Sequence, residues 1–241
     1  MKIVATIPTY NEAENIGRLI EALRNLSQPV EALVADDNSP DGTHKIVSDL
    51  SAKDAGVHLL LRMANRGRGY AGREAFIKAL LMNADVIVEM DADFSHDPAF
   101  IPALLEPILA GRSDMTIGSR FISGGRDAER TLLRRLLSKI SGAYVRLILG
   151  VQVSDPNSGF RAFSRKAMSA IDPETLVSAG PAIVHEVLFR TKQADLKIEE
   201  VPIIFKDRHA GASQLTVKKL IDGYIMVLRL RFFSARRRTK Q

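Results

Sequence analysis

Two carboxylates one residue apart, Asp91 and Asp93, are the residues of this sequence best suited to chemistry. They follow an apolar run at 86–90 that only Glu89 interrupts. Carboxylates at the end of a strand can both turn toward one ion, and Mg²⁺ or Mn²⁺ prefers oxygen ligands and keeps room for phosphate oxygens. The pair therefore predicts a divalent metal site, and the alternative is a solvated loop. His96, in the same loop, is either a further ligand or a hydrogen-bonding group.

A glycine-rich loop, Gly67-x-Gly69-x-x-Gly72, suggests a different chemistry. It lies between a strand pattern and a helix pattern, and Asp91 follows about 20 residues on, as in dinucleotide-binding proteins. Two strand–helix units precede the loop, whereas this fingerprint usually marks the first unit. The loop also carries three arginines, Arg66, Arg68 and Arg73. A dinucleotide-dependent oxidoreductase is therefore a rival hypothesis.

Strand and helix patterns alternate through the first half of the chain and position these loops. Apolar, β-branched runs indicate strands at 3–7, 30–35, 57–61, 86–90 and 115–117, with helical patterns between them at 13–26, 43–52, 71–83 and 98–110. This alternation predicts an α/β fold with a mostly parallel central sheet flanked by helices. Ligands of such sheets lie beyond the carboxyl ends of the strands, where Asp36-Asp37 and Asp91-Ala92-Asp93 fall.

Local signals refine these elements. Asn11 with Glu14 three residues later predicts an N-cap with a capping box, and Ser-Pro-Asp-Gly at 39–42 predicts a turn. Asp97 before Pro98 predicts a second N-cap. The second half is less regular, with helices expected at 131–149, 183–194 and 215–235, a strand at 197–205 and a turn-rich segment at 154–159. We expect one continuous domain at 1–214, followed by a basic amphipathic helix and tail at 215–241.

The basic charge of the chain is concentrated at its C-terminal end. The net charge is +6, but residues 217–241 hold eight Lys or Arg and one Asp, so the preceding residues carry a net charge of −1. A near-neutral body argues against binding of nucleic acid, and a basic tail beside apolar residues indicates an anionic membrane surface. The final helix either lies on that surface, docks on a small membrane partner or packs on the core.

The remaining composition excludes several classes of protein. Hydrophobic residues make up 46% of the chain, as in ordinary globular proteins, and the absence of cysteine excludes a disulfide framework and thiolate chemistry. The longest charge-free run of the final helix, 223–228, is far below the roughly 20 residues that span a bilayer. No long apolar stretch follows a charged start, so we expect no cleaved signal peptide.

Motifs along the chain resemble those of the inverting family-2 glycosyltransferases, which have the GT-A fold. In the first half these are Pro-Thr-Tyr-Asn-Glu at 8–12, Asp-Asn-Ser-Pro-Asp-Gly-Thr at 37–43, Asp-Ala-Asp-Phe-Ser-His-Asp-Pro at 91–98 and Gly-Ser-Arg-Phe at 118–121. In the second half, the segments 134–139, 155–161 and 200–208, with Gly211 and Ser213, look like those of the branch that makes dolichol-phosphate mannose and its polyprenol counterparts.

The resemblance implies a role for each matching position. The guanosine part of GDP-mannose would contact Pro8, Tyr10, Glu12 and Asp37. Asp91, Ala92 and Asp93 would hold the metal and the diphosphate. Arginines and a serine would face the phosphates of donor and lipid acceptor: Arg120 and Arg208 on the donor side, and Arg120, Arg134 and Ser138 on the acceptor side. Asp91, Asp93, Arg120 and Arg208 would be the catalytic residues. The sequence departs from the family pattern at Gln214, where lysine is usual, and at Arg68, where a small or apolar residue is usual.

The implied reaction is the transfer of mannose from GDP-mannose to a polyprenol phosphate, with inversion and with Mg²⁺ or Mn²⁺, at the cytoplasmic face of a membrane to which the protein binds peripherally. A phosphate monoester is already an anion near neutral pH, so this acceptor needs no strong general base. The alternatives are the same transfer from UDP-glucose and, from another class, a non-catalytic membrane-binding subunit.

Overall fold

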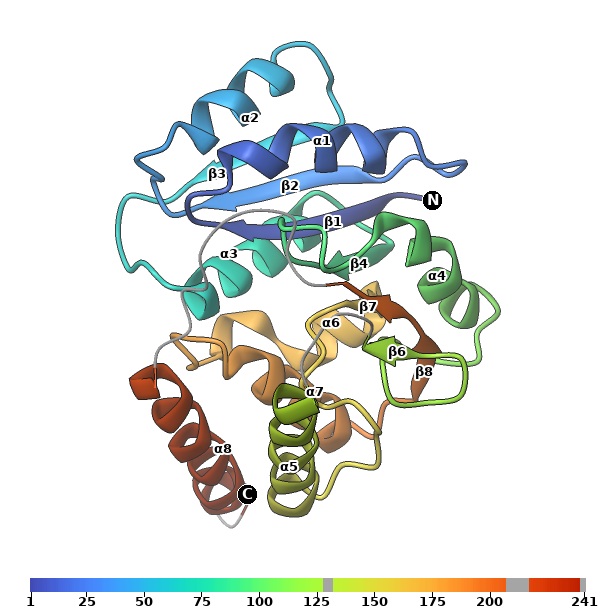
Figure 1. Ribbon diagram of the computed structural model, residues 1–241, viewed down its shortest axis with the longest axis vertical. Helices are drawn as coiled ribbons and strands as arrows, with labels where there is room; N and C mark the ends of the chain where they lie inside the picture. Colours follow the sequence, from blue (N-terminus) through green and yellow to red (C-terminus); the bar gives the residue numbers. More distant parts are fainter. Residues whose placement is uncertain (128–131, 207–216, 239–241) are drawn as a thin grey trace.

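Seven strands form the central sheet, in the spatial order β3-β2-β1-β4-β7-β5-β8. Their bounds are β1 Ile3–Thr9, β2 Glu31–Asp36, β3 Val57–Leu61, β4 Val86–Glu89, β5 Met115–Ser119, β7 Arg161–Ser164 and β8 Ile198–Pro202. Only β7 runs antiparallel to its neighbours, β4 and β5, so the sheet is mostly parallel as predicted. The computed structural model describes residues 1–127, 132–206 and 217–238 (Figure 1).

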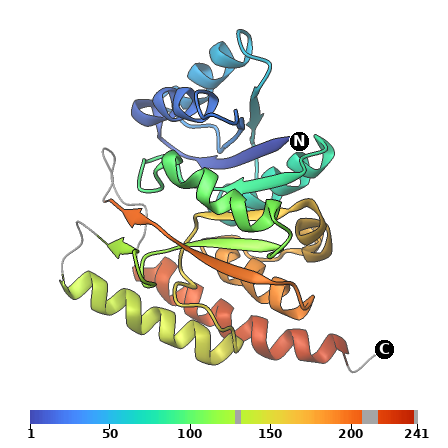
Figure 2. The same cartoon turned by 90° about the vertical axis from the view of Figure 1, so that its right-hand side faces the viewer.

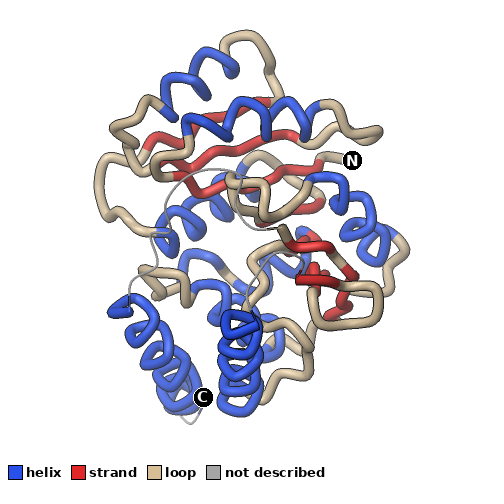
Figure 3. Tube along the Cα trace, viewed as in Figure 1, coloured by secondary structure: helices blue, strands red, loops and turns tan. Residues whose placement is uncertain are grey.

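Helices cover both faces of this sheet (Figure 3). One core cluster lies under α1 Ala13–Arg24, α2 Thr43–Ser51 and α4 Ile101–Leu109, which follows the 3₁₀ turn η1 Pro98–Phe100. The other lies under α3 Arg68–Leu81, α5 Leu132–Leu149, α6 Arg165–Ile171, α7 Ile183–Gln193 and α8 Val217–Arg238. Residues of β1 alternate between the two clusters, Val4 in one and Ile3 and Ala5 in the other, because successive strand side chains point to opposite faces. The predicted α/β class is confirmed.

The start of α1 differs from the prediction. Asn11 has a φ of 61° and lies outside the helix, and no side-chain cap is formed at Glu12, so the expected capping box is wrong. Instead, the Ala13 amide donates to an Asp41 carboxylate oxygen at 2.9 Å. Asp41 belongs to the predicted turn at 39–42, which is confirmed and in which Gly42 has a φ of 91°. A contact distant in sequence thus replaces the local cap.

The second half contains elements that the sequence patterns did not predict. The strand β7 and helix α6 follow the turn-rich segment directly, and the expected strand at 197–205 is divided at Ile203 into β8 and a short β9, Ile204–Phe205. This short strand pairs with β6, Arg126–Asp127, in a separate two-stranded sheet. Asp97 caps η1 by accepting from the Ala99 amide, as predicted. The expected boundary at 214 lies outside the described residues.

The helices α5 and α8 lie side by side at one end of the molecule (Figures 1 and 2). The Tyr144 hydroxyl of α5 donates to the Tyr224 carbonyl of α8 at 2.9 Å, and their rings meet edge to face. Val227 and Leu230 of α8 are buried in the core. The final helix therefore packs on the body of the protein, which was one of its expected arrangements. Within the described residues, no helix is long and apolar enough to cross a bilayer.

Candidate active site

The predicted acid pair lies at the carboxyl end of β4, beside the end of β1. Asp93 is almost fully buried, and both the amide and the hydroxyl of Ser95 donate to its Oδ1, at 3.1 and 2.6 Å. The Asp91 side chain is 34% exposed. One carboxylate is thus fixed by its own loop, whereas the other opens toward solvent.

Arg68, the first residue of α3, reaches across to this pair. Its guanidinium donates to Asp91 through Nη1, and its Nη2 lies 3.4 Å from Glu89 Oε1. A Cβ atom at Gly159 would lie 2.9 Å from Nη2, so the glycine leaves room for the arginine. Burial raises the pKa of Glu89, although the charges of Arg68 and Arg161 oppose this shift.

His96 supports the acid loop through a hydrogen bond. The Asp91 amide donates to His96 Nδ1 at 3.0 Å, and the imidazole stacks on Phe160 with ring centroids 5.1 Å apart. Burial lowers the pKa of His96, against the charges of Asp91 and Asp93. The neutral ring therefore has its proton on Nε2, and His96 holds the backbone of the first acid in place.

The two carboxylates fit a metal that is shared with a substrate. Among the residues that the structure describes, no group of three or more His, Asp or Glu side chains could hold an ion by itself. Mg²⁺ sites that act on phosphates commonly use one or two carboxylates and complete their coordination with water and phosphate oxygens. Asp91 and Asp93 are suited to such a partial set of ligands.

Arg120 lies at the end of β5 and forms a buried ion pair with Asp155. Its Nε and Nη2 donate to the two carboxylate oxygens at 2.7 and 2.8 Å, and its amide donates to one of them at 3.2 Å. Burial alone would lower the pKa of Arg120, but the hydrogen bonds and charge of Asp155 raise it. The guanidinium carbon lies 5.1 Å from the ring centroids of both Phe121 and Phe205. Phe205 also contacts His96, which connects this pair to the acid loop.

The loops after β1 and β2 form a second part of the site. Tyr10, at 38% exposure, lines a cavity of about 310 Å³ together with Ser39, Lys45 and Arg66. Pro8 lies at the end of β1, and the Glu12 amide donates to Thr43 Oγ1. These neighbours place three of the expected donor-binding residues, Pro8, Tyr10 and Glu12, at one edge of the sheet.

Asp37 has partners within the protein. Its Oδ1 accepts from Arg62, and its Oδ2 accepts from the Gly67 amide at 2.7 Å. The sequence patterns did not single out Arg62, which is buried and also binds Glu74. Asp37 therefore ties the loop after β3 and the glycine-rich loop to the end of β2.

The glycine-rich loop serves close packing. A Cβ atom at Gly69 would lie 2.0 Å from the Ser178 carbonyl oxygen, and one at Gly67 would lie 2.7 Å from that of Ala179. At Gly72 it would lie 3.2 Å from the Ile183 side chain. These glycines let α3 approach the segment before α7, and their fit against the chain provides no support for the dinucleotide hypothesis.

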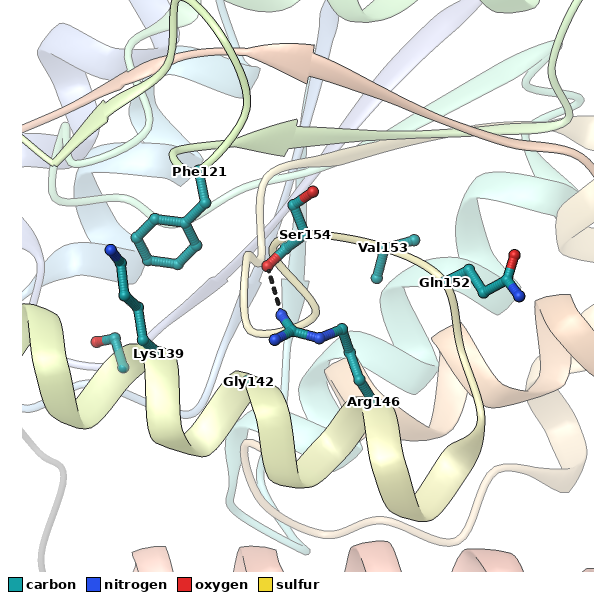
Figure 4. Close-up of a pocket in the computed structure, with 8 residues that line it drawn as sticks. Phe121, Lys139, Gly142, Arg146, Gln152, Val153 and Ser154 are labelled. Carbon is teal, nitrogen blue, oxygen red and sulfur yellow. Dashed lines mark hydrogen bonds between the residues drawn. The ribbon is translucent and has the colours of Figure 1, made fainter.

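Ser138, an expected acceptor residue, lines a cavity of about 490 Å³ beside α5. Phe121 and Lys139 face each other on one side of this cavity, and Arg146 donates to the Ser154 carbonyl at 3.0 Å between them and Gln152 (Figure 4). Ser138 and Phe121, the residue that follows Arg120, therefore line the same cavity. Arg208 lies outside the described residues, as does the side chain of Arg134.

The Arg120–Asp155 pair generates a stability prediction. Asp155→Asn leaves a buried guanidinium without its counter-charge, so we expect a loss of roughly 3 kcal/mol in the free energy of unfolding, measured by urea denaturation. Glu106→Gln is the matched control, because it breaks a solvent-exposed bidentate pair with Arg112 and should leave the curve nearly unchanged. Equal shifts in the two variants would contradict the structural role assigned to Asp155.

Comparison with known proteins identifies the family of the chain. Residues 5–172, more than half of the chain, match the model of "Glycosyl transferase family 2". The chain is 37% identical to the undecaprenyl-phosphate mannosyltransferase of Micrococcus luteus (90% of this chain, 88% of that protein) and 35% identical to the polyprenol monophosphomannose synthase of Mycolicibacterium smegmatis (94% and 85%).

A solved structure shows the same fold. Glucosyl-3-phosphoglycerate synthase from Mycobacterium tuberculosis, in complex with Mn²⁺, UDP-glucose and phosphoglyceric acid, superposes with a TM-score of 0.70 at 21% identity, covering 95% of this chain and 79% of that one. This likeness confirms the GT-A type of fold that the sequence motifs predicted. The chain belongs to glycosyl transferase family 2.

Proposed function

We propose that this protein transfers mannose from GDP-mannose to a polyprenol phosphate, with inversion at the anomeric carbon. The observation that carries the proposal is the similarity, along nearly the whole chain, to two proteins named for mannose transfer to polyprenyl phosphates. The edge of the sheet provides suitable groups, since an acid pair follows β4, a buried arginine follows β5 and a cavity lined by Tyr10 lies beyond the end of β1.

The donor would bind along this edge. We assign the guanosine to Pro8, Tyr10, Glu12 and Asp37. Asp37 would contribute by positioning the loop after β3 and the glycine-rich loop, since it accepts from Arg62 and from the Gly67 amide. Asp91 and Asp93 would hold Mg²⁺ or Mn²⁺ on the diphosphate beside Ala92, and Mn²⁺ is present in the complex of the M. tuberculosis enzyme. A bound ion neutralises the charge that develops on the departing GDP.

The acceptor would enter from the side of α5. A phosphate oxygen of the lipid attacks the anomeric carbon while the bond from that carbon to the donor diphosphate breaks, and GDP leaves with the electron pair. Because the attacking oxygen is already anionic, the residues need to hold and orient it, and they need not remove a proton. We assign this role to Ser138, which lines the cavity beside Phe121, and we assign Arg120, Arg134 and Arg208 to the phosphates.

The surface of α5 and α8 would bind the membrane. Among the described side chains, exposed aliphatic and phenylalanine residues include Leu136, Leu137, Ile140 and Leu147 on α5, and Ile221, Ile225, Leu228 and Phe232 on α8. Both sets recur at helical spacing, and the segment 217–241 carries a net charge of +7. An anionic bilayer matches this combination. We therefore propose peripheral binding at a cytoplasmic membrane face through two helices, with the helix and tail at 215–241 supplying the basic charge; a small membrane subunit stays a prediction.

The first prediction of this proposal concerns the metal. Chelation with EDTA should abolish transfer, and Asp93→Ala should slow it roughly a hundredfold, equivalent to about 3 kcal/mol of transition-state stabilisation. Asp97→Ala is the control, because that acid lies in the same loop but caps the following turn and pairs with Lys206 at 3.7 Å. Full activity in EDTA would show that no exchangeable metal takes part.

The second prediction concerns the acceptor. Polyprenol phosphate should accept mannose from GDP-mannose in a radiolabel transfer assay, whereas the free alcohol should not. Arg208→Ala should slow transfer roughly tenfold or more, because a charged hydrogen bond to phosphate is lost, without changing thermal unfolding. Arg112→Ala, which removes an exposed arginine far from the proposed phosphates, serves as control. Equal turnover of the alcohol would contradict an anionic nucleophile.

The third prediction concerns the membrane. Ile140→Glu combined with Phe232→Glu should weaken binding to phosphatidylglycerol-containing vesicles by at least roughly tenfold, since each side chain would contribute about 1.5–3 kcal/mol when buried in lipid. Donor affinity should be unchanged. Leu81→Glu, at 72% exposure on α3, is the matched control. Surface substitutions are more informative than removal of α8, which would uncover the core around Val227. Flotation of the double variant with the vesicles as efficiently as the unmodified protein would contradict the assignment.

A further inference from the structure

A cation of the protein itself binds the first acid of the pair, Asp91. The Arg68 guanidinium binds Asp91 and lies 3.4 Å from Glu89, and Asp93 adds to the negative charge around it. Burial alone would lower the pKa of Arg68, but these carboxylates raise it, so the side chain is positively charged. Arg68 thus provides the positive charge that a divalent ion would otherwise bring to Asp91.

We propose that Arg68 competes with the divalent cation for Asp91, so that the metal binds together with the nucleotide and only weakly before it. The proposal rests on the metal site assigned under the proposed function. A carboxylate oxygen that accepts from a guanidinium is not open to an ion, and a metal at that oxygen would face a like charge at close range. The diphosphate of the donor adds negative charge, which attracts the ion and offers the guanidinium new acceptors.

The surroundings of Arg68 allow this exchange. Its backbone is fixed, because the Gly67 amide donates to Asp37 and the Gly69 amide donates to the Ala179 carbonyl at 3.0 Å. Gly67 has a φ of 138°, a conformation that L side chains rarely adopt. The Arg68 side chain, in contrast, is 23% exposed. The guanidinium can therefore leave Asp91 by side-chain rotation alone.

Glu89 gives the arginine a second carboxylate within the site. It is buried directly before the acid loop, and its Oε2 has no hydrogen-bond partner. A guanidinium that turns away from Asp91 can strengthen its contact with Glu89 and so remain near the bound diphosphate. The exchange then keeps a counter-charge on the buried acid throughout.

The test is a titration of Mn²⁺ into the protein, measured by isothermal titration calorimetry once without GDP and once with GDP. Arg68→Leu should raise the affinity for Mn²⁺ without GDP by at least about tenfold, because the competing charge is gone, and Arg68→Lys should stay closer to the unmodified protein. With saturating GDP the difference should shrink to less than about threefold. Arg68→Gln, which keeps a polar side chain but not the charge, should repeat the effect of leucine, and circular dichroism checks that each variant is folded.

The possible outcomes distinguish failure of the role proposed for Arg68 from failure of the metal site proposed at Asp91 and Asp93. Equal affinities of the unmodified protein and Arg68→Leu without GDP would overturn the role of Arg68, while GDP-promoted Mn²⁺ binding would leave the metal site intact. Absence of Mn²⁺ binding in every variant, even with GDP, would overturn both. In Arg68→Leu the gained affinity should disappear when Asp91→Asn is added; if it persists, the ion binds elsewhere and the competition is refuted.

Discussion

The organisation of the site depends on charge compensation at the carboxyl edge of the sheet. Three acids beside strand ends each bind one arginine: Asp37 binds Arg62, Asp91 binds Arg68, and Asp155 binds Arg120. Burying a carboxylate costs free energy unless the carboxylate is paired with a cation. Removing one partner of such a pair leaves the other charge buried and uncompensated. These pairs also connect loops that are distant in sequence, so the same contacts that neutralise the acids set the shape of the edge.

The three pairs differ in how much of their charge can reach a ligand. Arg62 and Asp37 are both almost fully buried, and Arg120 lies between Asp155 and two aromatic rings. The Asp91 carboxylate and Arg68 are partly exposed, at 34% and 23%. The Arg62–Asp37 pair is therefore suited to hold loops in place, and Asp155 holds Arg120 in one orientation. The Arg68–Asp91 pair, in contrast, can exchange partners. Under the proposed function, this difference would let one edge be both rigid enough to orient a nucleotide sugar and open enough to admit an ion.

The first half of the fold could be predicted because its signals are local. Apolar runs and the acids that follow them indicated β1 to β5 in succession, and the acid pair lies where the pattern predicted. Features that depend on distant contacts could not be predicted in this way. The cap of α1 comes from Asp41, which is distant in sequence. The four-residue strand β7 is recognisable only by its pairing with β4 and β5, and the role of Arg62 is visible only from its ion pair with Asp37. The glycine-rich loop matched a ligand-binding pattern, but its glycines meet the Ser178 and Ala179 carbonyls, which no spacing rule could reveal.

The proposed function requires that this edge bind a guanosine diphosphate sugar together with a divalent ion. The most direct measurement is calorimetric binding of GDP-mannose, UDP-glucose and NAD to the full-length protein, each with and without Mn²⁺. We predict that GDP-mannose binds most tightly, that Mn²⁺ strengthens its binding by at least about tenfold, and that NAD does not bind. Tighter binding of NAD or UDP-glucose than of GDP-mannose, or binding of GDP-mannose that is indifferent to Mn²⁺, would contradict the account.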